Sequence, residues 1–190
     1  MKRAIALLEK HNLLKIISDE LDINLEIPHI AYVEVKRPDS KAILFTNVVD
    51  RKNSKKFKEP VLMNVFCNED AVKLFIGDGD KIGSEIESLL KLKPPVTFSE
   101  KLSTLGKLFS LKNTIPKKIK GKGICQEVIK LGADAKLSDL PVIKTWEDDA
   151  GPFITMGQVY TQSLNGELKN LGMYRLQVFL DHTLGMHRQI

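Results

Sequence analysis

Apolar positions in the first 115 residues predict helices and strands in alternation. A roughly helical stripe over residues 2–17 predicts a first helix. Residues 22–36 predict a second helix, with Pro28 in its first turn, where a missing N–H costs nothing. Short runs rich in branched residues predict strands at 41–48 and 60–66. This alternation is typical of an α/β layer arrangement.

Further helices are predicted in the same part of the chain. Asn68 is expected to cap a short helix that runs to about Phe75, because its side-chain oxygen can accept a free backbone N–H. A Gly-Asp-Gly-Asp turn then precedes a predicted helix over 81–92. A double proline separates it from another predicted helix at 99–111.

The pattern changes after Pro116, where glycines recur among short runs with alternating apolar residues. The runs 154–161 and 171–180 are separated by the turn 163–166, which contains Asn-Gly. An Asn-Gly pair between two alternating runs is a strong hairpin signal. We therefore predict an antiparallel β region in this part of the chain.

The predicted fold class is α/β, in the broader sense that includes α+β. Residues 1–115 are predicted to form an N-terminal α/β domain, and residues 116–190 a β-rich region. The boundary is expected near residues 112–122, where the pattern changes.

Composition places the chain among ordinary globular proteins, with 43% hydrophobic and 28% charged residues. There is no run of eighteen apolar residues and no apolar leader at the N-terminus, so we expect a soluble cytoplasmic protein. Cys67 and Cys125 lack a metal-type spacing. They are expected to be buried free thiols, the alternative being a metal or redox pair.

The net charge of +5 is concentrated in two basic runs, at 51–58 and 117–122. A nucleic-acid interface would use such runs for phosphate contacts, preferably beside aromatic rings. Phe57 is the sole aromatic residue in either run, so solvated loops are the favoured interpretation. A basic module that binds nucleic acid or a protein partner is the alternative.

Three consecutive acids, Glu147 to Asp149, stand just before a Gly-Pro turn. They could bind a divalent cation, although acidic residues are also common in solvated turns. Trp146, the only tryptophan, is expected to anchor the turn in the core.

The segment 170–175 combines three residue types that suit a ligand site. Asn170 offers a neutral oxygen to Mn²⁺ or Mg²⁺, and Gly172 permits close approach of a backbone or a flat ligand. Arg175 lies in an apolar strand, so it must meet an anion, either a structural carboxylate or a ligand's phosphate or carboxylate. In an unbroken strand Asn170 and Arg175 point to opposite faces. They share a site if Asn170 precedes the strand or if Gly172 marks a bulge.

His187, Arg188 and Gln189 follow a second turn and form a further candidate group. His187 could bind a metal, and the other two could hold a phosphate or ring heteroatoms. A lone histidine at a strand end is also commonly a structural residue.

Taken in order, the motifs at 145–155, 170–175 and 185–187 resemble the UbiD family of decarboxylases. The segments 25–27, 42–45 and 60–64 match the N-terminal order of that family. The resemblance implies a reversible, non-oxidative carboxy-lyase that uses prenylated FMN with Mn²⁺ and a potassium ion. It also implies that residues 116–190 begin a split β-barrel that binds the flavin.

The resemblance also implies a role for each site residue. Asn170 corresponds to a manganese ligand, with His187 a second candidate ligand. Arg175 corresponds to the arginine that holds the substrate carboxylate. The residues implied to contact the cofactor are Met173, Tyr174, Arg175, His187, Arg188 and Gln189.

Members of this family are more than twice as long as the present chain, so the resemblance implies an N-terminal fragment without activity of its own. A second metal carboxylate and the proton-donating acid would follow Ile190. The implied substrate is an aromatic or unsaturated acid in menaquinone or ubiquinone biosynthesis. Implied partners are a flavin prenyltransferase and further copies of the protein, in the cytoplasm or at the periphery of the inner membrane. An ordinary FMN-binding oxidoreductase is a weaker alternative.

Overall fold

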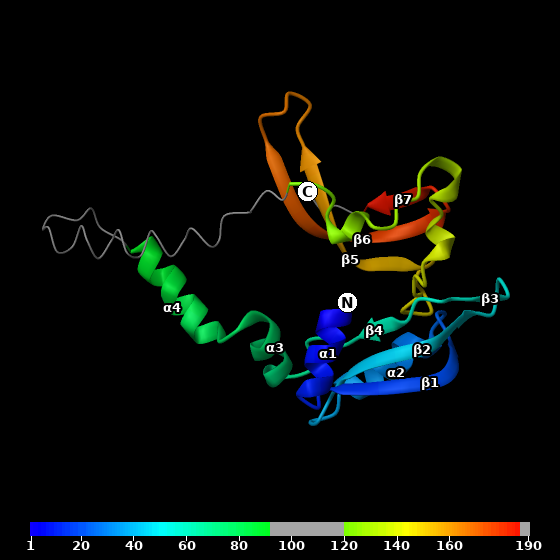
Figure 1. Ribbon diagram of the computed structural model, residues 1–190, viewed down its shortest axis with the longest axis horizontal. Coiled ribbons are helices and arrows are strands. Elements are labelled where there is room, and N and C mark those ends of the chain that lie inside the picture. The colour runs from blue at the N-terminus through cyan, green and yellow to red at the C-terminus, as the bar shows by residue number, and fades with distance from the viewer. Residues whose placement is uncertain (92–119, 187–190) are drawn as a thin grey trace, which may run out of the picture. The chain divides into compact units, whose positions relative to one another are not determined.

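The computed structural model describes residues 1–91 and 120–186, which contain two β-sheets and several helices (Figure 1). Residues 1–75 and 132–190 form one compact unit, and residues 76–131 form the other. Both sheets belong to the first unit.

The first sheet has four strands, with β2 at its centre. Strand β1 (Leu14–Asp22) runs parallel to β2 (Ala42–Asp50). Strands β3 (Lys55–Lys56) and β4 (Val61–Met63) both pair antiparallel with β2. Helix α2 (Glu26–Val35) makes the crossover between β1 and β2, as a parallel pair requires.

The core of this sheet is formed by β2 and by the buried side of α2. Phe45 is 1% exposed, and Ile27, Ile43 and Val48 are fully buried. Ile143, far along the chain, belongs to the same hydrophobic cluster. The predicted strand at 41–48 is therefore the structural centre of the first unit.

The predicted helix over 2–17 is too long. Helix α1 (Lys2–Lys10) ends early, and Asn12 adopts a left-handed φ of 56°. Residues from Leu14 onward form β1 instead, where Ile16 pairs with Leu44. Branched residues favour a strand, and the long-range pairing with β2 outweighs the helical spacing.

Helix α2 confirms a helix within the predicted range 22–36, although it begins at Glu26 because Asp22 ends β1. The carboxylate of Glu26 accepts the backbone N–H of Asp22 at 2.8 Å and binds Arg51 at 2.5 Å. These two hydrogen bonds lower the pKa of Glu26, the backbone bond having the larger effect.

Two more helices follow β4. Asn68 caps α3 (Glu69–Ile76) by accepting the N–H of Ala71 at 2.9 Å, as predicted. Helix α4 (Gly79–Leu90) is capped by Asp78. The helix predicted for 99–111 lies outside the described residues. No helix in the described part of the chain is long and apolar enough to cross a membrane.

The second sheet is an antiparallel meander. Strand β5 (Phe153–Gln162) pairs with β6 (Lys169–Leu180), which pairs with β7 (Thr183–Met186). The predicted hairpin is confirmed.

The fold class is confirmed as mixed α/β, with an α/β part followed by the strands of a second sheet. These strands form no closed barrel within residues 120–186. The division at residue 115 stays a prediction, because the segment around it lies outside the described residues.

The chain from Ile143 to Phe153 connects the two sheets. Lys144 forms a parallel bridge with Asn24, donating its N–H to the carbonyl of Ile23 at 3.1 Å and accepting the N–H of Leu25 at 3.1 Å. Phe153, the first residue of β5, donates to the carbonyl of Ile143 at 3.0 Å. These bonds place the acidic turn at 147–149 between the first core and the second sheet.

Candidate functional site

The candidate site is built on the β5–β6 hairpin. Its tip is closed by a hydrogen bond from Ser163 to the carbonyl of Leu168 at 2.8 Å, and Gly166 has a φ of 76°. Glycine adopts this left-handed conformation without a steric penalty, which fixes the turn and hence the register of the two strands. Thr161 consequently faces Asn170, and Gly157 faces Tyr174.

Asn170 and Tyr174 lie on one face of β6. The Asn170 amide donates to the Tyr174 hydroxyl at 3.4 Å, and its Oδ1 atom accepts no hydrogen bond from the described residues. Both residues line a pocket of about 340 Å³ together with Thr161 and Met186. An amide oxygen of a pocket-lining residue that accepts no hydrogen bond from the described residues suits a hard cation such as Mn²⁺.

Gly172 makes room for a side chain of its own strand. A Cβ atom at this position would lie 2.5 Å from the ring of Tyr174. We expected this glycine to admit a backbone or a flat ligand, but the Tyr174 ring fills the space.

Arg175 binds a structural carboxylate, one of the alternatives left open by the sequence. Its Nη2 atom lies 2.6 Å from Oδ2 of Asp149, whose side chain is 10% exposed. Its guanidinium carbon lies 3.7 Å from the centre of the Phe153 ring. The hydrogen bond from Arg175 is the main cause that holds the pKa of Asp149 below its ordinary value of 3.8.

Asn170 and Arg175 are on opposite faces of β6. They are five positions apart, an odd offset, and β6 is regular at Gly172. The bulge near this point lies in β5, between Ile154 and Gly157. The side chains of Asn170 and Arg175 therefore lie on opposite sides of β6 and do not share one pocket. Their assigned roles stay predictions.

The other candidate residues are placed only in part. Met173 is 66% exposed. Met186 ends β7 opposite Leu176 and lines the pocket that contains Asn170. The next residues, His187, Arg188 and Gln189, lie outside the described residues. The pocket of Asn170 is therefore next to the chain that leads to His187.

The turn at 146–149 is closed by hydrogen bonds between Trp146 and Asp149. Asp149 accepts the N–H of Trp146 through Oδ2 and donates its own N–H to the Trp146 carbonyl, both at 3.1 Å. Within the described ranges, no group of three His, Cys, Asp or Glu residues could hold a metal ion.

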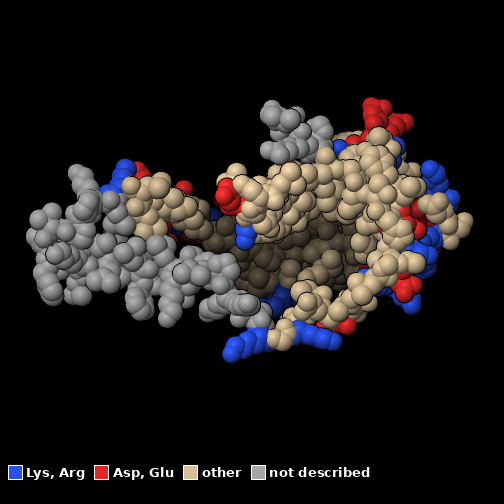
Figure 2. Space-filling view, turned by 90° about the horizontal axis from the view of Figure 1, so that it is seen from above, with Lys and Arg blue, Asp and Glu red and all other residues tan. Residues whose placement is uncertain are grey.

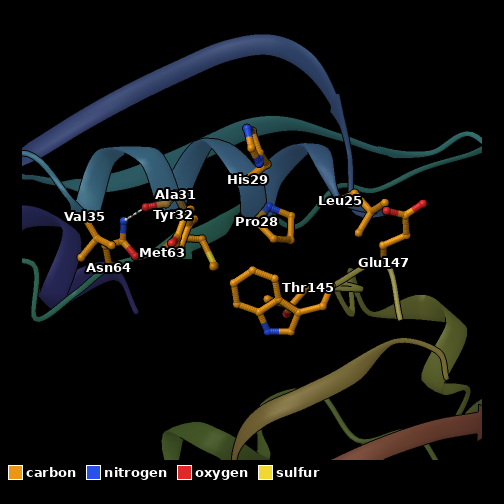
Figure 3. A pocket seen from close by; sticks show the side chains of 11 residues that line it. Leu25, Pro28, His29, Ala31, Tyr32, Val35, Met63, Asn64, Thr145 and Glu147 are labelled. Carbon is orange, nitrogen blue, oxygen red and sulfur yellow. Dashed lines mark hydrogen bonds between the residues drawn. The ribbon is translucent and has the colours of Figure 1, made fainter. Parts of the chain in front are cut away.

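Trp146 is 54% exposed, so the expected core anchor is wrong. It meets Tyr32 of α2 edge to face, with ring centres 5.6 Å apart. Both rings border an apolar groove of about 440 Å³, which Figure 3 shows between α2 and Thr145. The hydroxyl of Thr145 is buried and has no hydrogen-bond partner among the described residues.

The basic run at 51–58 is largely neutralised by acidic residues. Arg51 binds Glu26, Lys55 lies 3.3 Å from Asp139, and Lys56 lies 3.7 Å from a glutamate of β1. Acidic and basic side chains are interspersed on the face seen in Figure 2. The described part of this run does not form a continuous positive surface.

The two cysteines are both free, and they differ in burial. Cys67 is buried, which raises the pKa of its thiol, whereas Cys125 is exposed. The predicted burial is right for Cys67 and wrong for Cys125, which lies in a short 3-10 helix (Ile124–Gln126) that has no buried residue.

The link between Asp149 and Arg175 was not found from the sequence. Each residue was a candidate by itself, one as part of an acidic turn and the other as a charge in an apolar strand. The signal that could have joined them was complementarity, since a costly charge in a strand needs a partner of opposite sign.

Comparison with known proteins agrees with this mixed α/β class. Residues 5–90 match the model of the 3-octaprenyl-4-hydroxybenzoate carboxy-lyase N-terminal domain, and residues 117–190 match that of the Rift-related domain of the same enzyme. The chain belongs to the UbiD family.

Full-length relatives extend well beyond this chain. An uncharacterized protein of Helicobacter pylori is 44% identical over 195 residues, which cover 100% of this chain and 31% of the relative. A protein of Aquifex aeolicus is 38% identical over 186 residues, covering 96% of this chain and 37% of the relative. The chain thus spans about a third of the length of these relatives.

Solved structures share the fold at low sequence identity. Vanillic acid decarboxylase of Sedimentibacter hydroxybenzoicus, in its closed form, has a TM-score of 0.70 and 19% identity, covering 99% of this chain and 37% of that one. The UbiD-class enzyme HmfF of Pelotomaculum thermopropionicum, solved with prFMN, has a TM-score of 0.62 and 21% identity, covering 99% and 38%.

Proposed function

We propose that the full-length protein is a non-oxidative decarboxylase that acts on an aromatic or unsaturated carboxylic acid with prenylated FMN and Mn²⁺. Membership of the UbiD family supports the carboxy-lyase class. The observation that carries the proposal is Arg175, a guanidinium that is held in place and still 41% exposed.

Arg175 suits the binding of a carboxylate. A guanidinium presents planar forks of N–H groups that match the two oxygens of a carboxylate. The interaction orients the scissile bond of the substrate, and orientation can supply a large part of a rate enhancement. When bound, the prenylated flavin supplies the electron sink for the pair left by CO₂. HmfF, solved with FMN and with prFMN, supports the choice of a flavin.

Asn170 is proposed as a manganese ligand. Its amide donates to Tyr174, which turns the oxygen atom away from that contact and leaves it without a donor in the described structure. Mn²⁺ accepts neutral oxygen ligands of this kind. His187 is proposed as a second ligand, and a potassium ion as an additional cofactor.

We further propose roles for the residues around these two. Met173, Tyr174, Arg188 and Gln189 would contact the flavin with Arg175 and His187. Tyr174 has a second task, since its hydroxyl orients the Asn170 amide.

The proposed biological setting is menaquinone or ubiquinone biosynthesis. The family description names 3-octaprenyl-4-hydroxybenzoate, an aromatic acid, which supports a substrate of this class. A flavin prenyltransferase would supply the cofactor. Assembly with further copies is proposed because HmfF has been solved in an evolved dimeric form. A cytoplasmic location, extending to the periphery of the inner membrane, is part of the same proposal.

The test uses full-length protein produced together with a flavin prenyltransferase. We expect a bound flavin in the absorption spectrum and manganese on elemental analysis. Asn170→Ala should remove the metal, and Arg175→Ala should preserve folding but abolish turnover of aromatic acids. Unchanged manganese in the first variant, or wild-type decarboxylation in the second, would contradict the assigned roles.

The same full-length protein distinguishes the decarboxylase from the two alternative functions, a nucleic-acid-binding module and an ordinary FMN oxidoreductase. A nucleic-acid module would bind without flavin and lose affinity steeply with salt, and the neutralised basic run already speaks against it. An ordinary FMN oxidoreductase would hold unmodified FMN and would not respond to Asn170→Ala.

A further inference from the structure

We propose that Asp149, together with Phe153, is a positioning residue that fixes the guanidinium of Arg175 to receive a substrate carboxylate. The inference rests on the proposed function, in which Arg175 is the residue that touches the substrate.

Arg175 needs contacts that hold its guanidinium in one position, because its side chain is partly exposed and flexible. Its side chain is 41% exposed, and a long flexible side chain loses much conformational entropy when a ligand immobilises it. Two contacts impose this order before any ligand arrives. Asp149 holds Nη2 at 2.6 Å, and the Phe153 ring lies 3.7 Å from the guanidinium carbon.

Asp149 is itself held by its own turn. Its Oδ2 atom accepts the N–H of Trp146, and its N–H donates to the carbonyl of the same residue, both at 3.1 Å. With 10% of its side chain exposed, Asp149 is shielded from water that would compete for Arg175.

The turn at 146–149 is anchored to the hydrophobic core through the residues on either side of it. Lys144 exchanges backbone hydrogen bonds with Ile23 and Leu25, both at 3.1 Å, and Phe153 binds the carbonyl of Ile143 at 3.0 Å. Ile23 and Ile143 belong to one buried cluster. The position of the Asp149 carboxylate is therefore determined by the packed core rather than by a free loop.

The contact with Asp149 leaves Arg175 able to bind. A guanidinium has two forked edges, and each uses one of the two N–H groups on Nη2. A single bond from Nη2 to Asp149 therefore occupies one edge. The guanidinium makes no other hydrogen bond to the described residues, so the second edge remains for a carboxylate.

A competing role for Asp149 predicts the opposite sign. If Asp149 simply occupied Arg175 in place of the substrate, its removal would tighten the binding of carboxylates. Positioning predicts weaker binding, because the arginine would have to be ordered by each incoming ligand. The direction of the change therefore distinguishes the two roles.

The experiment measures the affinities of the full-length holoprotein for benzoate and for benzamide by titration calorimetry. Benzamide has the same ring and no charge, so it reports on the pocket without the ion pair. We expect Arg175→Ala and Asp149→Ala each to weaken benzoate binding about tenfold, the scale of a lost charge-assisted hydrogen bond, and to leave benzamide unchanged. The double variant should bind benzoate no worse than Arg175→Ala alone, since Asp149 acts through Arg175.

Two further variants control for folding and charge. Asp148→Ala removes a neighbouring exposed acid of the same turn and should leave benzoate binding unchanged. If Asp149→Ala does not fold, Asp149→Asn carries the test, because it keeps the shape and loses the charge. It should weaken benzoate binding about threefold, as expected when a charged acceptor becomes neutral.

The outcomes separate the inference from the proposed function. Weaker benzoate binding in Arg175→Ala, with unchanged or tighter binding in Asp149→Ala, would overturn the positioning role alone. Equal loss of benzoate and benzamide affinity in Asp149→Ala, or an additive loss in the double variant, would show a structural effect and overturn it as well. A wild-type protein that binds benzoate no better than benzamide would overturn the proposed function and this inference together.

Discussion

The two sheets of the first unit differ in how deeply their strands are buried by other residues of the described structure. Strand β2 is buried along most of its length, and Phe45 at its centre is 1% exposed. Strand β6 is exposed or half-buried throughout, and Phe179 near its end is 56% exposed. The first sheet has its own core, whereas the second does not have one in the described structure.

The exposed side chains of the second sheet are apolar to an unusual degree. Large apolar residues exposed in groups mark surfaces that another part of a protein covers. Relatives about three times as long supply a natural source for such a cover. The exposed large apolar residues on β5, β6, β7 and the turn between β5 and β6 are Met156, Tyr160, Leu164, Leu168, Leu171, Met173, Phe179, Leu180, Leu184 and Met186.

The largest expected effect compares one phenylalanine from each sheet. Phe45→Ala should reduce the free energy of unfolding of the 190-residue chain by about 3–5 kcal/mol, because it leaves a cavity in a closed core. Phe179→Ala should cost less than about 1 kcal/mol, as expected for an exposed site. Urea denaturation of the two variants measures the difference. Equal losses would mean that the second sheet is as well packed as the first.

A smaller effect is expected where Gly172 packs against the Tyr174 ring in the second sheet. Gly172→Val should cost about 1–3 kcal/mol, because the new side chain would collide with the Tyr174 ring. It should also break the hydrogen bond between Asn170 and Tyr174, and so reduce manganese retention in the full-length protein. Thermal unfolding and elemental analysis measure the two effects.

Gly83→Ala is the matched control for this substitution. Gly83 lies within α4 with nothing within 4 Å of an added Cβ, so the helix should gain about 0.5–1 kcal/mol. Tolerance of valine at Gly172 would show that the ring of Tyr174 is free to move away.

The smallest expected effect concerns acid stability, because two carboxylates are each bound to an arginine, Glu26 at the start of α2 and Asp149 in the turn before β5. The pKa values of Glu26 and Asp149 are lowered in the folded protein, from ordinary values of 4.5 and 3.8. Each carboxylate therefore stabilises the fold above its ordinary pKa, and this stability is lost as the pH falls through the folded pKa.

Glu26→Gln should flatten the loss of stability that begins as the pH falls below 4.5, and Asp149→Asn the loss that begins below 3.8. Urea midpoints between about pH 6 and pH 3 would show this. An unchanged acid profile in Glu26→Gln would mean that neither the N–H of Asp22 nor Arg51 stabilises the charged form.

Sequence patterns correctly predicted the elements whose signals are contiguous in the chain. They did not predict the elements that depend on pairing with a distant segment. The strand at 41–48 and the Asn-Gly hairpin were predicted because their apolar spacing and turn residues are contiguous. The start of β1, residues 14–17, was assigned to a helix because the strand depends on pairing with β2 across a crossover. Residue propensities and apolar spacing do not reveal which distant strand a segment pairs with.

The site shows the same division. The residue types at Asn170 and Arg175 identified a candidate site, and strand parity predicted their opposite faces. Asp149 lies 26 residues before Arg175 on a different element, so no periodicity connects them. The roles of His187, Arg188 and Gln189 depend on a part of the chain outside the described residues.

The parallel bridge between Asn24 and Lys144 has a consequence for how the length of this protein can vary. The entropy of closing a loop grows with the logarithm of its length, so doubling the loop costs only about 0.6 kcal/mol. Residues 76–131 form a separate unit inside this loop, and insertions or deletions there should cost little free energy. A single residue added between Lys144 and Phe153 would instead shift Asp149 relative to Arg175. Evolution can therefore change the length of residues 76–131 at little cost, while the segment from Lys144 to Phe153 must keep its length.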